Sequence, residues 1–255
     1  MNIPVIRGVI DRRILINYHV DPSVLVRVLP HPFRPQVVHG AALAGICLIR
    51  LKQVRPTYLP SWLGISSENA AHRFAVEWDD TNGVGSGVYV NRRDTSSRLN
   101  ALAGGRLFPG LHHHARFDVA ETAETLEIAV RSDDGAMRLS VRGRRAARLP
   151  ASSIFASLAE ASALFEAGSL GYSATADPTR FQGLELRCTD WRVEPLEISE
   201  VHSSMFDDAA LFPAGSIEFD SALLMRGIQH EWHGKPDFCG AANDRNNCLL
   251  EPAAR

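Results

Sequence analysis

The stretch His72–Asn91 decides the fold class, and its sequence is HRFAVEWDDTNGVGSGVYVN. From His72 to Trp78 apolar and polar side chains alternate, which is typical of a β-strand with one buried face. The polar, glycine-containing segment 79–83 predicts a turn, and Gly87–Asn91 predicts the partner strand. We therefore expect an antiparallel hairpin here and an antiparallel sheet around it.

Most of the remaining chain shows the same pattern of strands between turns. Further strands are predicted over residues 13–18, 37–51, 112–120, 125–131, 137–144, 184–193 and 217–225. Asp21-Pro22 predicts the start of a short helix, with Asp as N-cap and Pro at the first helical position. The strongest helical periodicity covers Ser153–Ala167, capped by Ser152 or Ser153. The whole predicts an α+β fold, an antiparallel β-barrel with a few packed helices, as one domain over 1–238 and a flexible tail over 239–255.

Composition excludes several classes of protein. The 255 residues carry a net charge of −2, so no basic field favours nucleic acid or an anionic membrane surface. The longest apolar run, Ala41–Ile49, is shorter than the roughly 20 residues of a membrane-spanning helix, and Arg7 and Asp11 interrupt any secretory signal. Four scattered cysteines are typical of reduced thiols. We expect a cytoplasmic protein without nucleic-acid or membrane partners.

A run of three histidines, His112-His113-His114, is the most conspicuous polar motif. On a strand, His112 and His114 face one side and His113 the other. Three interpretations stay open: a metal site, acid–base catalysis, and the polar surface of a sheet. No phosphate loop, dinucleotide fingerprint or H-E-x-x-H motif is present, so no cofactor is predicted.

Several further motifs occur in the order in which one enzyme family has them. They are Ile14–Asp21 with Val28–Phe33 after it, Leu63–Glu68 (L-G-x-x-x-E), Gly87–Val90 with Asp94 (G-x-Y and Y-L-D), Gly105-Arg106 (G-R-E), and Pro195-Leu196 with Glu200–Ser204 (P-V-K-E-I-V-S-S-S). Together they resemble the acetoacetate decarboxylase family over about residues 14–220, and the chain is also similar to that family's uncharacterised relatives. The resemblance implies the family's barrel, a pocket for a small oxo acid, an active-site carboxylate at Glu68 and, by analogy, self-association.

The sequence departs from this family at its catalytic lysines. Family decarboxylases form a Schiff base through a lysine activated by burial and by a neighbouring lysine. Counted without gaps from Gly105-Arg106, that pair falls on His113 and His114, and imidazole cannot form a protonated imine. The chain has 25 arginines but only two lysines, Lys52 and Lys235, and neither is near this point in sequence. The resemblance thus implies the fold and a pocket, while the sequence argues against the Schiff-base reaction.

The first functional hypothesis is an enzyme of lyase or isomerase type that needs no lysine. Glu68 with His113 or His114 would move protons as catalytic residues. Arg73, Arg106 and His112 would bind the substrate, with an arginine holding its carboxylate through paired hydrogen bonds.

Three alternatives stand beside this hypothesis. The cavity would instead belong to a non-catalytic binder of a small organic acid or a lipid-like molecule, or His112, His114 and Glu68 would bind a metal ion. In the third alternative, Glu68, Arg73 and Arg106 form buried ion pairs that only hold the sheet. A functional set should line a pocket together, whereas a structural set should be closed off from solvent.

Overall fold

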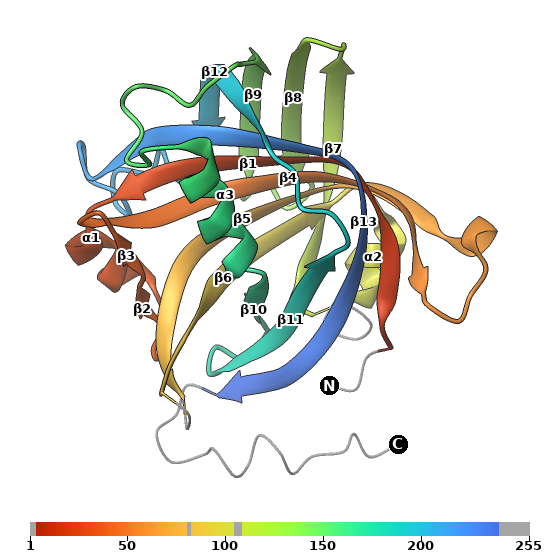
Figure 1. The fold of residues 1–255 in the computed structure, drawn as a ribbon. Coiled ribbons are helices and arrows are strands. Elements are labelled where there is room, and N and C mark those ends of the chain that lie inside the picture. The colour runs from red at the N-terminus through yellow and green to blue at the C-terminus, as the bar shows by residue number, and fades with distance from the viewer. Residues whose placement is uncertain (1–3, 81–82, 105–108, 240–255) are drawn as a thin grey trace.

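The computed structural model describes residues 4–80, 83–104 and 109–239, and most of them lie in strands (Figure 1). The strands are β1 (Ile6–Val20), β2 (Arg34–Pro35), β3 (Val37–Val38), β4 (Ala41–Pro56), β5 (Ile65–Asp80), β6 (Gly83–Thr95), β7 (His112–Glu121), β8 (Thr125–Ser132), β9 (Arg138–Arg145), β10 (Leu170–Ala174), β11 (Arg180–Cys188), β12 (Glu194–Ser203) and β13 (Ile217–Cys239). The helices are α1 (Pro22–Val28), the 3-10 helix η1 (Ser61–Leu63), α2 (Arg98–Ala103) and α3 (Leu158–Ala167).

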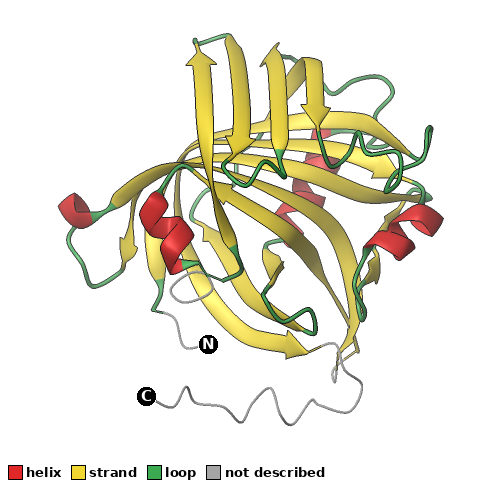
Figure 2. Ribbon diagram, turned by 180° about the vertical axis from the view of Figure 1, so that it is seen from behind, coloured by secondary structure: helices red, strands yellow, loops and turns green. Residues whose placement is uncertain are grey.

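Seven of the strands close into a ring. Around it, β13 pairs with β1, β1 with β4, β4 with β5 and β5 with β6, all antiparallel. The ring is completed by β10 and β11: β10 pairs with β6 in parallel over only three positions, and β11 pairs antiparallel with both β10 and β13. Strands β7, β8, β9 and β12 stand above this ring and join β6 to β13 by a second path (Figures 1 and 2). The expected antiparallel barrel with a few packed helices is confirmed.

The hairpin predicted around residues 72–91 is present and longer than expected. Strand β5 begins at Ile65, so Glu68 lies in a strand and not in a loop. Within the hairpin, Trp78 pairs with Gly85, and a Cβ atom at Gly85 would lie 2.5 Å from the Trp78 indole. Glycine at this position therefore allows the indole of Trp78 to approach the backbone of the partner strand closely.

Two helix predictions have different outcomes. Helix α1 begins at Pro22, and the Asp21 side chain accepts a hydrogen bond from the Ser23 amide, as predicted. Helix α3 begins only at Leu158, with Ser157 as its N-cap, so the predicted start at Ser153 is wrong. The Ser153 hydroxyl instead donates to the buried Asp220, which also accepts from the Ile154 amide. This tertiary contact keeps residues 153–156 out of the helix.

The ring has two covered faces, because successive side chains of a strand point to opposite sides. Even-numbered residues such as Ile14, Ile46 and Phe74 belong to the largest apolar core. On the opposite face, α3 crosses β1, β4 and β5 and packs its Phe165 against a second core (Figure 1). The polar residues of this second face form the site described below.

The structure bears on two expectations, the absence of a membrane-spanning helix and the reduced state of the cysteines. None of the described helices is long and apolar enough to cross a membrane. Cys47 and Cys188 are free thiols, but Cys239 is disulfide-bonded, which corrects the expectation of reduced cysteines throughout. The predicted tail, apart from Cys239, lies outside the described residues.

Buried histidines predict an acid-sensitive fold. Burial lowers the pKa of His72 and of His230 to about 4, while an unfolded histidine titrates near 6.5. Between these values the unfolded chain binds protons that the folded chain does not. The free energy of unfolding should therefore fall by about 1.4 kcal/mol per pH unit for each such histidine as the pH drops below about 6.5.

Urea unfolding between pH 7 and pH 5 measures this slope above the range in which carboxylates titrate. The variant His72→Gln should lose about one histidine's share of the slope. An unchanged slope in that variant would contradict the assignment.

Candidate functional site

A cavity of about 150 Å³ lies within the seven-stranded ring, and every strand of the ring contributes to its wall. That volume holds a small molecule and not merely one water. Part of the wall is apolar, including Ile49, Leu184 and Trp232. Its polar lining residues are Arg13, Cys47, Asn69, Arg73, Arg93, Asp94, Asn100, His112 and Ser169.

Strand alternation brings the polar residues to one face. Arg13 of β1 lies opposite Ile49 of β4, which lies opposite Asn69 of β5. Four residues along β5, Arg73 lies opposite Gly45, where a Cβ atom would be 3.2 Å from the Arg73 guanidinium and 2.6 Å from a backbone oxygen of β1. The absence of a side chain at Gly45 therefore gives Arg73 its space.

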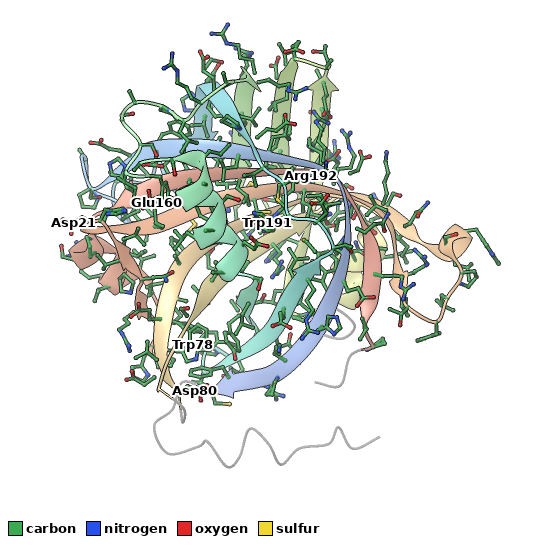
Figure 3. The ribbon with its side chains drawn as sticks, in the orientation of Figure 1. Asp21, Trp78, Asp80, Glu160, Trp191 and Arg192 are labelled. Atoms are coloured by element: carbon green, nitrogen blue, oxygen red, sulfur yellow. The ribbon has the colours of Figure 1, made fainter. Side chains whose placement is uncertain are left out.

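Three guanidinium groups converge on this cavity. Arg73 is only 7% exposed; its Nη2 donates to the Asn17 side-chain oxygen at 2.6 Å, and its Nε has no hydrogen-bond partner among the described residues. Arg93 donates from Nε and Nη2 to the Ser173 hydroxyl at 3.1 and 2.9 Å. Arg13 lies over the Trp191 ring, 5.7 Å from its centroid. Figure 3 shows Trp191 beside α3, where its indole donates to Ser162.

No carboxylate forms an ion pair with Arg13, Arg73 or Arg93 in the part of the chain that the structure describes. The lining carboxylate of Asp94 is already held by Arg92, which donates to it from Nε at 3.0 Å and from Nη2 at 2.9 Å. Burial lowers the pKa of Arg73 and of Arg93 to about 10, a value that still leaves both charged at neutral pH. The cavity is thus bordered by positive charge that the described residues do not neutralise.

His112 is the neutral member of this group. Burial, followed by the charge of Arg93, lowers its pKa to about 4. Its Nδ1 lies 3.1 Å from the Gly110 carbonyl oxygen, so the neutral ring carries its proton on Nδ1. His112 therefore adds no charge to the cavity at neutral pH.

The structure brings together only part of the residue set proposed from sequence. Arg73 and His112 line the cavity. Glu68, His113 and His114 are not among the described lining residues: His113 pairs with Asp134 and His114 with Asp133, both through Nδ1. Arg106 lies outside the described residues. No cluster of three metal-binding side chains occurs within residues 4–80, 83–104 and 109–239.

Glu68 belongs to a row of charged residues across four strands. Arg226 of β13, Arg12 of β1, Arg50 of β4 and Glu68 of β5 are successive neighbours in this row. Arg12 is fully buried, with Glu68 at 2.6 Å, and Glu68 also accepts from Arg50 at 2.5 Å. Glu121, at the end of β7, contacts all three arginines at 2.5 to 3.1 Å. This charged row holds β1, β4, β5, β7 and β13 together.

The sequence reasoning missed Arg13, Arg93 and Cys47 as cavity residues. The available signal was the alternation of side chains along each strand, which puts Arg13, Cys47 and Arg73 on one face of three neighbouring strands. That alternation identifies a shared face only once the pairing of the strands is known. The bulge between His72 and Arg73 shifts the pairing of β5 with β6, so alternation alone does not predict that Arg93 faces the cavity.

Comparisons with known proteins identify the family and the fold. The family model of DUF2071, "Uncharacterized conserved protein", matches residues 10–227. A search of curated proteins found no match. Acetoacetate decarboxylase from Legionella pneumophila is similar in structure with a TM-score of 0.61 and 14% identity, covering 92% of this chain and 89% of the other. An acetoacetate decarboxylase-like enzyme from Sphingomonas wittichii RW1 has a TM-score of 0.55 at 12% identity, covering 94% and 92%.

A third similar structure is the enduracididine biosynthesis enzyme MppR complexed with pyruvate, with a TM-score of 0.56 at 10% identity over 92% and 91% of the two chains. At these identities the likeness shows the fold, and it confirms the acetoacetate decarboxylase-like barrel expected from the sequence motifs.

The charged row predicts a stability role for Glu68. The substitution Glu68→Gln leaves buried Arg12 with Glu121 as its remaining carboxylate, so the free energy of unfolding should fall by about 3 kcal/mol. Chemical denaturation measures this, with Glu127→Gln, which removes an exposed partner of Arg142, as a control that should change little. A Glu68→Gln protein as stable as the parent would show that the row does not hold the sheet.

Proposed function

The chain belongs to the DUF2071 family, and from the geometry of its cavity we propose that it binds a small oxo acid through the guanidinium groups of Arg13, Arg73 and Arg93. The ligand is held as an anion, without a Schiff base.

The observation that carries this proposal is the uncompensated charge of the three arginines. A cation withdrawn from water is costly unless an anion accompanies it. Elsewhere in the described chain, the buried arginine Arg12 has carboxylate partners. At the cavity, Arg73 lines the wall and its Nε has no hydrogen-bond partner among the described residues. A carboxylate fits this need, because its two oxygens match the planar donor array of arginine.

The remaining wall favours a short carbon skeleton. A volume of about 150 Å³ bounded by Ile49, Leu184 and Trp232 suits a few carbon atoms beside the charged end. MppR, which shares the fold, forms a complex with pyruvate, and other neighbours are named for acetoacetate. These similarities support an oxo acid over other small anions.

The two lysines support binding without an imine. Lys52 pairs with Asp11 at 2.7 Å and is half exposed, and Lys235 pairs with Glu185 at 3.2 Å. Neither is among the described lining residues. This is the basis on which we propose that the chain differs chemically from Schiff-base decarboxylases.

Removing one guanidinium should weaken binding without unfolding the protein. A hydrogen bond to a charged group contributes about 1.5–3 kcal/mol, so Arg73→Gln and Arg93→Gln should each weaken pyruvate binding by about tenfold to a hundredfold in calorimetry. Both variants should keep the melting temperature of the unliganded parent or raise it, because each removes a positive charge that no described carboxylate pairs with.

The matched control is Arg138→Gln, which changes an exposed arginine of β9 and should leave affinity unchanged. Methyl pyruvate, the uncharged analogue, should not bind measurably. The proposal is wrong if pyruvate, acetoacetate and 2-oxoglutarate all fail to raise the melting temperature, or if methyl pyruvate binds as well as pyruvate.

Trapping with borohydride tests the absence of an imine. Treating the protein with pyruvate and borohydride should give no reduced adduct on Lys52 or Lys235 in peptide mass spectrometry, since both amines are ion-paired outside the cavity wall. A pyruvate-dependent adduct on either lysine would contradict the proposed binding mode.

A further inference from the structure

Cys47 lies within the proposed oxo-acid site. It is on β4, opposite Leu15 of β1 and Ala71 of β5, on the same face of the sheet as Arg13 and Arg73. Its side chain is 9% exposed and lines the cavity as a free thiol. The other free thiol among the described residues, Cys188, is not among the described lining residues.

A guanidinium holds the Cys47 sulfur in place. Arg13 donates from Nε to Cys47 Sγ at 3.4 Å, while its Nη1 lies 3.9 Å from the Met225 sulfur and its plane lies over Trp191. The Cys47 sulfur is thus held at the cavity wall in contact with a positively charged group.

A second observation points independently to a ligand next to this sulfur. Arg73 lines the same cavity and is 7% exposed, and its Nε has no hydrogen-bond partner in the described structure. Cys47, Arg73 and Arg93 all line this wall, so the sulfur and both guanidinium groups border one cavity. A carboxylate bound by these arginines would have its adjacent carbonyl carbon close to a thiol.

We propose that Cys47 is the nucleophile of this site and adds reversibly to the carbonyl carbon of the bound oxo acid. This inference rests on the proposed function. The Sγ–C bond forms as the carbonyl π bond breaks, its electron pair moves to oxygen, and the proton lost by the thiol ends on that oxygen. The product is a hemithioketal, and no oxidant or reductant takes part. Arg13, beside the sulfur, is placed to stabilise negative charge on the thiolate or on the developing alkoxide.

A thiol adduct differs from a lysine adduct in one respect. Addition of sulfur stops at the tetrahedral carbon, because sulfur has no second proton to lose on the way to a neutral double bond. The adduct therefore holds the ketone covalently but, unlike a protonated imine, cannot accept the electron pair that loss of the carboxylate would release. The predicted chemistry is covalent and reversible at the carbonyl group, and the ligand's carboxylate is retained.

Carbon-13 NMR of the protein with [2-13C]pyruvate tests the adduct directly. A protein-dependent tetrahedral C2 signal is expected in the parent and in Cys188→Ala, and its loss is expected in Cys47→Ala and Cys47→Ser. Calorimetry on the same samples measures pyruvate binding separately. Binding that persists in the parent without a tetrahedral signal, or a signal that persists in Cys47→Ala, would overturn the role of Cys47 while leaving the proposed function intact. Absence of any binding would instead overturn the proposed function.

Alkylation gives a second, irreversible readout. With 3-bromopyruvate, the sulfur displaces bromide, an Sγ–C bond forms and the thiol proton passes to solvent. Peptide mass spectrometry should show Cys47 modified at least tenfold faster than Cys188, and added pyruvate should slow only the reaction at Cys47. Labelling of Cys188 first, or labelling of Cys47 that pyruvate does not slow while calorimetry shows it bound, would contradict the proposal.

Discussion

A guanidinium taken out of water requires an anion nearby, and this requirement governs both faces of the ring. On one face, Arg12 lies fully buried between Arg226 and Arg50, an arrangement that alone would push three strands apart. Glu68 and Glu121 supply the missing negative charge from β5 and β7. Because these partners come from strands distant in sequence, charge compensation here also fixes which strands are neighbours.

Arg13, the next residue of β1, has no carboxylate partner among the described residues. Arg13 points to the other face because side chains alternate, and with Arg73 and Arg93 it borders a cavity whose described carboxylate, Asp94, is already engaged by Arg92. The same residue type thus has carboxylate partners on one side of the strand and none among the described residues on the other. In the proposed function, a small anion would supply on the cavity face the negative charge that Glu68 and Glu121 supply on the opposite face.

Those parts of the fold that depend on short stretches of sequence were predicted correctly. The hairpin over 72–91, the short helix after Asp21 and the barrel class are all found, and Arg73 and His112 do line the cavity. The grouping of Glu68 with the histidines could not be corrected from sequence, because its partners Arg12 and Arg50 become visible only with the strand register. The start of α3 was misplaced for a similar reason, since a distant residue, Asp220, holds Ser153. Self-association stays a prediction.

The pairing that closes the ring bears on how a small molecule could reach the cavity. The parallel contact of β10 with β6 spans three residue pairs, from Gly171 with Val88 to Ser173 with Val90, whereas β1 and β13 are joined along almost their whole length. Parting the short seam breaks the fewest backbone hydrogen bonds, and Val88, Val90 and Gly171 on its two sides all face the cavity. The seam between β10 and β6 is therefore the joint of the ring at which local opening would reach the cavity at the lowest cost in backbone hydrogen bonds.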